Sequence, residues 1–275
     1  MPPEDDQNKD RYSKIILHLF RKHYSEGATE VVFHRSEIGP ASEAEGVEAP
    51  RNLGDLIYYF RFRQPLPEEI IRKTPPGQQW IIRSGGRSIY KLVAITPTFE
   101  IVPNPHKLTI KIPDSTPGII ARYALSDEQA LLAKLRYNRL IDIFTGLSCY
   151  SLQNHLRTTV KGIGQVETDE VYVAIDSRGA HYVIPVQAKG GRDTQSIVQI
   201  EHDAAMCRQK FKGLVCRPVA AQFMAENQIA MFDFIEVDGE IKLVNEQHYQ
   251  LVLPGEITLE ELQTYLQISR TTSAS

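Results

Sequence analysis

The stretch that decides the fold reads QVETDEVYVAID over residues 165–176 and, after a Ser-Arg-Gly turn, AHYVIPVQAKGG over residues 180–191. A third strand-like run, CYSLQNHLRTTV at residues 149–160, precedes them and is joined to them by the turn Lys-Gly-Ile-Gly. Short glycine-containing turns favour antiparallel pairing of neighbouring strands. We therefore predict a three-stranded antiparallel meander over this region.

The segments on either side of the meander have a helical period. Residues 126–144 place leucine, isoleucine and phenylalanine on one face, with Ser126 as the expected N-cap and Gly146 as the end of the helix. Residues 194–211 form the next helical run, and its polar residues Gln195, Gln199, Glu201, His202 and Asp203 are expected on the solvent side. Buried strands follow at 214–225 and 228–237. The predicted order is helix, three strands, helix, strand.

The second and third strands of the meander carry the candidate catalytic residues. Because strand side chains alternate between faces, Gln187 and Lys189 share one face, as do Glu167 and Asp169. Two acids opposite an amide and a lysine offer the oxygen ligands that Mg²⁺ prefers, and a lysine beside the metal would activate a water molecule. The alternative stays open for each residue: Lys189 could emerge at a strand end, and Asp169 could lie on a solvated edge.

The N-terminal region has a different pattern. Helical runs at 11–24, 37–47 and 51–63, with an extended stretch at 30–34 between the first two, precede two β-runs joined by Ser-Gly-Gly within residues 79–95. The hairpin carries Arg83, Arg87 and Lys91, and the segment QWIIRSGGRSIYKL contains no acidic residue. Such a hairpin suits contacts with phosphate groups, or is simply a solvated hairpin.

Residues 10–95 resemble a winged helix-turn-helix domain in the order of their elements. The resemblance implies that the third helix enters the DNA major groove and that the hairpin touches the backbone or the minor groove. Candidate DNA-binding residues are Arg51, Asn52, Tyr59 and Arg63 with the third helix and Arg83, Arg87 and Lys91 on the hairpin. Winged helices also serve as protein-protein modules, which leaves that alternative open.

Residues 126–225 resemble the PD-(D/E)xK nuclease superfamily in element order and in motif. Asp169 matches the first motif position, and Gln187-Ala188-Lys189 matches the second, with Gln187 in place of the usual acid. The resemblance implies that Asp169 and Gln187 serve a Mg²⁺ ion and that Lys189 activates the attacking water. From its place on the same strand face as Asp169, Glu167 is expected as an auxiliary acid that restores the charge that Gln187 lacks. The family often adds an acid from the preceding helix, for which Asp142 and Glu128 are the candidates, and Asp142 joins the predicted metal ligands.

Composition limits the class of protein. The 275 residues contain 31 Lys and Arg against 34 Asp and Glu, a net charge of −3, which excludes a histone-like polybasic binder. Three cysteines without CxxC spacing, a polar N-terminus and no apolar run of about 18–20 residues indicate a cytoplasmic protein with reduced thiols, no structural zinc and no membrane partner.

These observations predict an α/β (α+β) protein: a winged-helix-like domain at 1–95, a proline-rich connector at 96–125, a restriction-endonuclease-like core of a mixed central sheet flanked by helices at 126–267, and a disordered tail at 268–275. The expected function is Mg²⁺-dependent cleavage of double-stranded DNA by a type II restriction endonuclease. One site per chain then predicts a homodimer. The alternatives are a structure-specific repair or junction-resolving nuclease, and a non-catalytic DNA-binding regulator.

Overall fold

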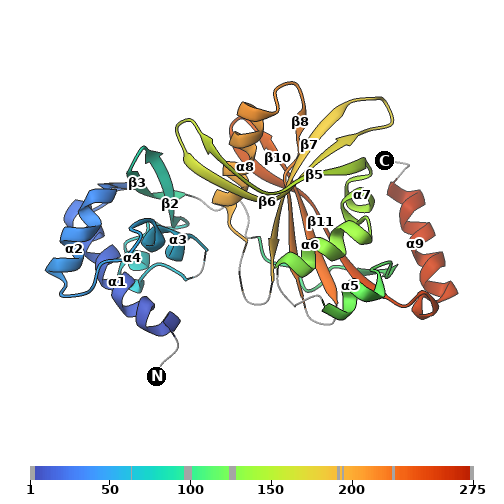
Figure 1. Cartoon of the computed structure of the whole chain (residues 1–275), viewed down its shortest axis with the longest axis horizontal. Helices are drawn as coiled ribbons and strands as arrows, with labels where there is room; N and C mark the ends of the chain where they lie inside the picture. The colour runs from blue at the N-terminus through green and yellow to red at the C-terminus, as the bar shows by residue number, and fades with distance from the viewer. Residues whose placement is uncertain are drawn as a thin grey trace. The chain divides into compact units, whose positions relative to one another are not determined.

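The computed structural model describes residues 4–62, 64–95, 101–123, 128–190, 193, 195–224 and 227–272, and within these ranges the side chains of residues 4–9, 62 and 269–272 are not part of the description. The chain divides into two compact units. The N-terminal unit contains residues 1–100, with a three-stranded sheet and its helices, and also residues 157–166 and 196–202. The C-terminal unit contains the rest of the chain, with most of an eight-stranded sheet and the remaining helices. Each unit is described by itself below (Figure 1).

The N-terminal unit has the predicted helices and hairpin. Its elements are α1 (Glu4–His23), β1 (Glu30–His34), the 3₁₀ turn η1 (Arg35–Glu37), α2 (Ile38–Ala44), α3 (Gly54–Phe62), α4 (Glu68–Arg72), β2 (Gln79–Gly86) and β3 (Ile89–Ile95). The sheet order is β1-β3-β2, with both pairs antiparallel. Helix α4 was not predicted, because its five residues are too few to show a helical period.

Apolar residues at helical spacing build the core of this unit. Ile15, Ile16 and Leu19 of α1 are fully buried, and they belong to one apolar cluster with Leu56 of α3 and Ile82 of β2. Burial of such side chains is the dominant favourable term in folding, at roughly 1.5–3 kcal/mol each. The unit therefore has its own hydrophobic core.

The C-terminal unit is a mixed sheet flanked by helices. Its elements are β4 (Thr109–Pro113), α5 (Gly118–Tyr123), α6 (Glu128–Tyr137), α7 (Leu140–Thr145), β5 (Ser148–Val160), β6 (Gly164–Ile175), β7 (His181–Lys189), α8 (Ile197–Lys210), β8 (Val215–Cys216), β9 (Val219–Phe223), β10 (Gln228–Val237), β11 (Glu240–Val252), the 3₁₀ turn η2 (Pro254–Glu256) and α9 (Leu259–Thr272). The strand order is β4-β11-β10-β9-β7-β6-β5, with β8 paired to β7. Strand β9 runs parallel to β7, whereas β6 and β7 are antiparallel.

The single helix predicted over residues 126–144 is two helices in the structure. Arg139 adopts a left-handed conformation with φ of 51°, which ends α6 and turns the chain into α7, and Gly146 at φ of 70° ends α7 as predicted. The expected N-cap, Ser126, lies outside the described residues. Leu131, Leu135 and Ile141 of these helices pack in one apolar cluster with strands β6 and β7. This contact fixes the helix pair against the sheet.

Two boundary predictions are changed by the structure. Residues 101–123, expected to connect the domains, contribute α5 and strand β4, which pairs in parallel with β11. Helix α9 continues to Thr272, into the region 268–275 that the sequence analysis expects as a tail, and no glycine or proline interrupts it. A capping box opens α9, because the Glu261 N–H donates to Thr258 Oγ1 at 3.2 Å and the Thr258 N–H donates to Glu261 Oε2 at 2.8 Å.

The structure is a mixed α and β fold with a large mixed sheet flanked by helices, which confirms the predicted class at that level. Among the described helices, none combines the length and the hydropathy that crossing a bilayer requires.

Candidate functional site

The candidate site begins where strands β6 and β7 stop pairing. Their antiparallel ladder runs from Ile175 opposite His181 to Glu170 opposite Val186. At the next position the Ala188 N–H donates to the side chain of Asp169, at 2.8 Å from Oδ2. The Asp169 carboxylate thus accepts a main-chain hydrogen bond at the end of the ladder, and only 8% of the Asp169 surface is exposed.

Burial has an electrostatic consequence for Asp169. It raises the pKa of this carboxyl group above its ordinary value, while the Ala188 N–H and the charge of Lys189 act in the opposite direction. The negative charge of Glu128 raises the pKa of Asp169 further, and His155 lowers it. Burial disfavours the charged form of Asp169, and a nearby cation would stabilise that form.

Lys189 lies close to a second acid. Its Nζ donates to Glu128 Oε1 at 2.9 Å, and its side chain is only 8% exposed. Glu128 is the first described residue of α6, so the helix and the end of β7 meet here. Of the two helix acids considered from the sequence, the structure brings Glu128 to Lys189.

Gln187 is held by a buried network beneath the surface. Its Nε2 donates to Asp203 Oδ2 at 2.9 Å and to the main-chain oxygen of Glu167 at 3.2 Å. Thr168 Oγ1 donates to the other oxygen of Asp203 at 2.5 Å. Both N–H groups of the Gln187 amide are therefore used inside the protein, which fixes the direction of its carboxamide.

The buried position of Asp203 is a correction to the sequence analysis, which expected it on the solvent side of its helix. Asp203 is fully buried on α8. It follows Ile200 by three residues and precedes Cys207 by four, and both of these are buried, so the spacing places Asp203 within the apolar stripe. The stripe was the signal that could have identified it.

The other two predicted metal ligands have separate contacts. The Glu167 carboxylate lies 3.5 Å from His155 Nδ1 on β5, where His155 itself has a left-handed φ of 49°. Asp142 accepts hydrogen bonds from Arg139, which precedes α7, and from the Cys149 N–H of β5. His155 was not proposed from the sequence.

The predicted DNA-binding residues of α3 are only partly accessible. Arg51 and Asn52 are exposed just before the helix, and Asn52 Oδ1 accepts from Arg35 at 2.7 Å. Tyr59 is a correction: it is 3% exposed and packs edge-on against Tyr12, with ring centroids 5.1 Å apart. It follows Leu56 by three residues and therefore joins the buried stripe. Arg63 lies outside the described residues.

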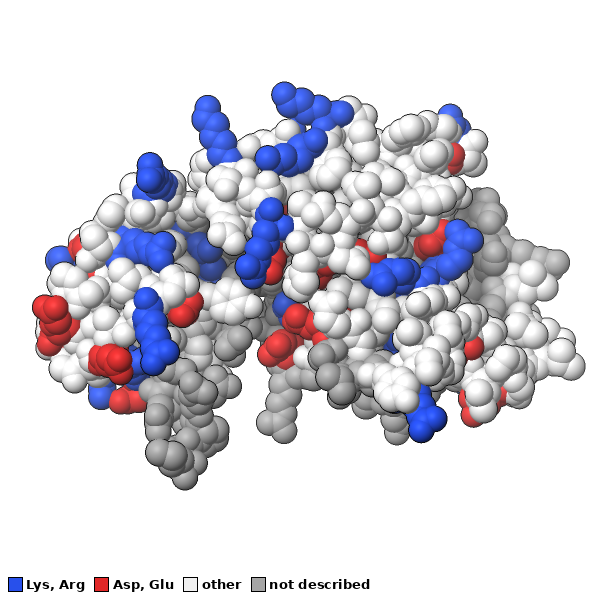
Figure 2. All heavy atoms as spheres, viewed as in Figure 1, with Lys and Arg blue, Asp and Glu red and all other residues white. Residues whose placement is uncertain are grey.

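The hairpin residues differ in their surroundings. Arg87 is exposed at the turn between β2 and β3, and Arg83 lies on β2. Lys91 on β3 pairs with Glu30 of β1 at 3.0 Å, so its charge is locally offset. Figure 2 shows lysine and arginine side chains spread over the face in view, with aspartate and glutamate side chains among them. On that face the cations do not form one unbroken patch.

The donor set at the candidate site fits a hard divalent cation in its chemistry. Asp169 and Glu128 supply carboxylate oxygens and Gln187 supplies a carboxamide, which are ligand types that Mg²⁺ accepts. In the part of the chain that the structure describes, no group of three or more His, Cys, Asp or Glu side chains is arranged to hold a metal ion. The fit therefore depends on the two acids together with the amide and water.

Comparison with known proteins adds no relative to this description. No family model, no curated protein and no solved structure matches the chain. The interpretation of the site rests on its residues and their geometry.

The pH dependence of folding tests the buried Asp203. Burial raises its pKa to about 7, against the lowering effects of Thr168 and Gln187. Because the folded pKa exceeds the unfolded one, the stability contributed by this group is present below about pH 4 and is lost as the pH rises through 7. In Asp203→Asn, chemical denaturation at pH 5 and pH 8 should show a flatter pH dependence of the unfolding free energy than wild type. Identical slopes would contradict the burial of a titrating carboxyl group here.

Proposed function

We propose that this chain is a Mg²⁺-dependent endonuclease that hydrolyses phosphodiester bonds of double-stranded DNA. The observation that carries the proposal lies at the end of the β6–β7 ladder, where Lys189 Nζ donates to Glu128 and the charges of both groups act on the Asp169 carboxylate. Two acids beside a buried lysine, with Asp169 and Lys189 on the sheet and Glu128 at the start of α6, form a group that is suited to phosphoryl chemistry. In its narrower form the proposal is a sequence-specific type II restriction endonuclease acting as a homodimer.

The fold around the site supports the same proposal. Helices α6 and α7 precede the three strands β5, β6 and β7, helix α8 follows, and β9 then pairs in parallel with β7. This is the element order on which the resemblance to the PD-(D/E)xK nucleases was based. The N-terminal unit likewise has helices followed by a β2–β3 hairpin, the order of a winged helix-turn-helix.

Asp169, Glu128 and the Gln187 carboxamide would hold the Mg²⁺ ion. When bound, the ion would stabilise negative charge on the phosphate and lower the pKa of a water ligand. Asp203 accepts hydrogen bonds from the Gln187 amide and from the Thr168 hydroxyl, and these two contacts hold the Gln187 side chain in place. The Asp169 carboxylate is in turn fixed by the Ala188 N–H.

Lys189 would act on the attacking water. Its ammonium group lies within hydrogen-bonding distance of Glu128 and is nearly buried, so it is oriented before substrate arrives. In this position it donates a hydrogen bond that orients the water and offsets charge on the phosphate oxygens. The site thus supplies positioning and charge, which are the main requirements of phosphodiester hydrolysis.

A second candidate function is favoured by one observation. Gln187 stands where an acid is usual in the family resembled, and its amide N–H groups are used on Asp203 and the Glu167 carbonyl. A site with fewer anionic ligands suits a DNA-binding regulator that does not cleave. Under this alternative the chain binds duplex DNA and Mg²⁺ has no effect on the DNA.

One assay separates these functions. Plasmid DNA and a four-way DNA junction are each incubated with the full chain and Mg²⁺. Discrete linear fragments support the restriction enzyme, and preferential cutting of the junction supports a structure-specific nuclease. Tight binding without cleavage of either substrate would overturn the proposed endonuclease and support the regulator.

Arg87 tests the proposed role of the hairpin. Arg87→Ala should weaken duplex binding uniformly across sequences and reduce the slope of log affinity against log salt by about one, since one phosphate contact is lost. Fluorescence anisotropy at several salt concentrations measures both quantities. Arg72→Ala is the control, because Arg72 is also exposed but pairs with Glu68 one turn away on α4. An unchanged salt slope in Arg87→Ala would contradict a phosphate contact at the hairpin tip.

A further inference from the structure

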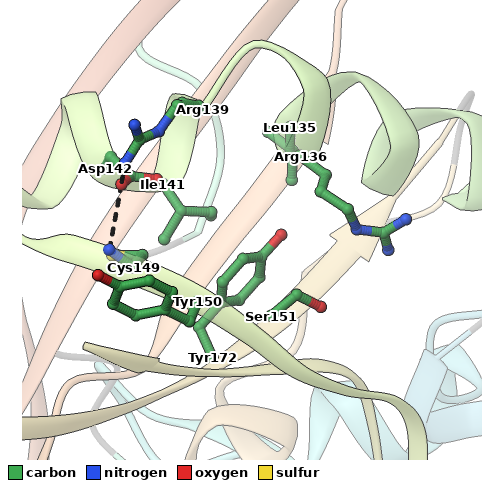
Figure 3. A pocket seen from close by; sticks show the side chains of 9 residues that line it. All are labelled: Leu135, Arg136, Arg139, Ile141, Asp142, Cys149, Tyr150, Ser151 and Tyr172. Atoms are coloured by element: carbon green, nitrogen blue, oxygen red, sulfur yellow. Dashed lines mark hydrogen bonds and ion pairs between the residues drawn. The ribbon is translucent and has the colours of Figure 1, made fainter.

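A pocket of about 330 Å³ lies between helices α6 and α7 and strands β5 and β6, apart from the Lys189 contacts. It is lined by Leu135, Arg136, Arg139, Ile141, Asp142, Cys149, Tyr150, Ser151 and Tyr172 (Figure 3). All of these residues belong to the C-terminal unit. The pocket has no role in the proposed hydrolysis.

The inner wall of the pocket contains a polar group that the protein does not satisfy. Tyr172 is 4% exposed, and its hydroxyl lies beside Glu170 and Arg136 but makes no hydrogen bond of good geometry with either. Burial and the charge of Glu170 raise the pKa of Tyr172, so the hydroxyl stays protonated. A buried hydroxyl without a partner is costly, and a ligand group in the pocket would satisfy it.

The other walls combine cationic, aromatic and apolar groups. Arg136 is anchored by the buried Glu170, with its Nε 3.1 Å from Oε1, and Ser151 Oγ donates to the same oxygen at 2.5 Å. Arg139 is anchored by Asp142 at the opening. Tyr150 is 61% exposed, so its ring offers an aromatic face.

Cys149 adds no charge to this pocket. Burial raises the pKa of its thiol to about 11, so the group is neutral at pH 7. Together with Leu135 and Ile141 it forms an apolar surface. The pocket thus presents an exposed aromatic ring, an apolar wall, an unsatisfied hydroxyl and two guanidinium groups held by acids.

From this combination we infer that the pocket binds one nucleotide unit, with the base between Tyr150 and the apolar wall and the phosphate at one of the two guanidinium groups, Arg136 or Arg139, which lie at opposite ends of the pocket (Figure 3). Aromatic side chains stack on any base, and a tyrosine hydroxyl bonds to a donor or an acceptor on the base edge, so the pocket is expected to accept all four bases. Guanidinium groups suit phosphate oxygens.

The unit can come from free nucleotide or from an extruded residue of DNA. Arg136 lies eight residues after Glu128 on α6, or about 12 Å along the helix axis. At 3.4 Å per step this spans between three and four steps of a DNA strand. A base taken out of the duplex near the proposed site would reach a pocket of this kind.

Calorimetric titration of the full chain with dAMP tests the inference without any cleavage, so its failure is distinguishable from failure of the proposed nuclease. Wild type should bind dAMP, and deoxyribose 5-phosphate should bind at least about fivefold more weakly because it lacks the stacking base. Tyr150→Ala should weaken dAMP binding by a similar factor. Tyr123→Ala, which removes another exposed tyrosine, should leave it unchanged.

Tyr172→Phe gives a readout that a merely structural role would not produce. Loss of the hydroxyl should weaken dAMP binding by about fivefold, the value of one net hydrogen bond, yet raise the thermal midpoint of the nucleotide-free protein. Displacement of dAMP by a duplex with one unpaired base identifies DNA as the source, and its retention identifies free nucleotide. No binding of millimolar dAMP by wild type, or binding as tight as wild type by both Tyr150→Ala and Tyr172→Phe, would overturn the inference.

Discussion

Replacing Lys189 with methionine is expected to lower the rate of DNA cleavage by at least about a hundredfold while leaving DNA affinity nearly unchanged. Lys189 is nearly buried and its ammonium group contacts Glu128, so it is fixed at the proposed reaction centre and has little exposed surface for DNA. Methionine keeps the aliphatic stem that fills the space at the end of β7. Single-turnover cleavage and anisotropy binding, measured on the same preparation, separate the two effects.

The matched control is Lys242→Met. Lys242 is an exposed lysine on β11 of the same unit, and its replacement removes the same charge from a surface position. It should cleave at the wild-type rate. If Lys189→Met also retains full cleavage, with its thermal midpoint unchanged, Lys189 has no part in the reaction and the assignment fails.

Asp169→Asn is expected to reduce Mg²⁺-dependent cleavage by about a hundredfold or more and to raise the Mg²⁺ concentration needed for half-maximal rate. The asparagine side-chain oxygen can still accept the Ala188 N–H, so the end of the ladder stays in place. What is lost is the negative charge that would hold the cation. Cleavage rates over a Mg²⁺ titration report both changes.

The same substitution has a second, independent effect on stability. Because burial raises the folded pKa of Asp169 above its unfolded value, wild type loses stability as the pH rises through the folded pKa, and the variant does not. Asp169→Asn should therefore be relatively more stable at pH 8 than at pH 4. Glu240→Gln, at an exposed position of β11, is the charge control and should alter neither property. A wild-type Mg²⁺ titration in Asp169→Asn would remove Asp169 from the proposed site.

The sequence predicted the secondary structure best where local features of the chain determine it. Short glycine-containing turns between the strand-like runs predicted the paired strands on which Asp169, Gln187 and Lys189 lie, because such turns favour antiparallel pairing of neighbours. Gly146 likewise predicted the end of α7. These features depend on local chain geometry, which the sequence determines directly.

Tertiary contacts were harder to predict. Asp203 is polar by type but lies in the apolar stripe of α8, where Thr168 and Gln187 of neighbouring strands satisfy it. Tyr59 was assigned to a DNA-facing surface, yet its ring is large enough to complete the N-terminal core. Glu128, and not Asp142, lies near Lys189, because the chain turns at Arg139 between α6 and α7. The sequence of residues 126–144 has one continuous helical pattern and so did not predict this turn.

The most direct test of the central proposal is cleavage of supercoiled plasmid by the purified full chain, in Mg²⁺ and in excess EDTA, beside Lys189→Met. We expect linear products with 5′-phosphate and 3′-hydroxyl ends for wild type in Mg²⁺, intact plasmid in EDTA, and intact plasmid for Lys189→Met in either buffer. Intact plasmid with the wild-type chain in Mg²⁺ on DNA that it binds, or equal cutting by wild type and Lys189→Met, would contradict it.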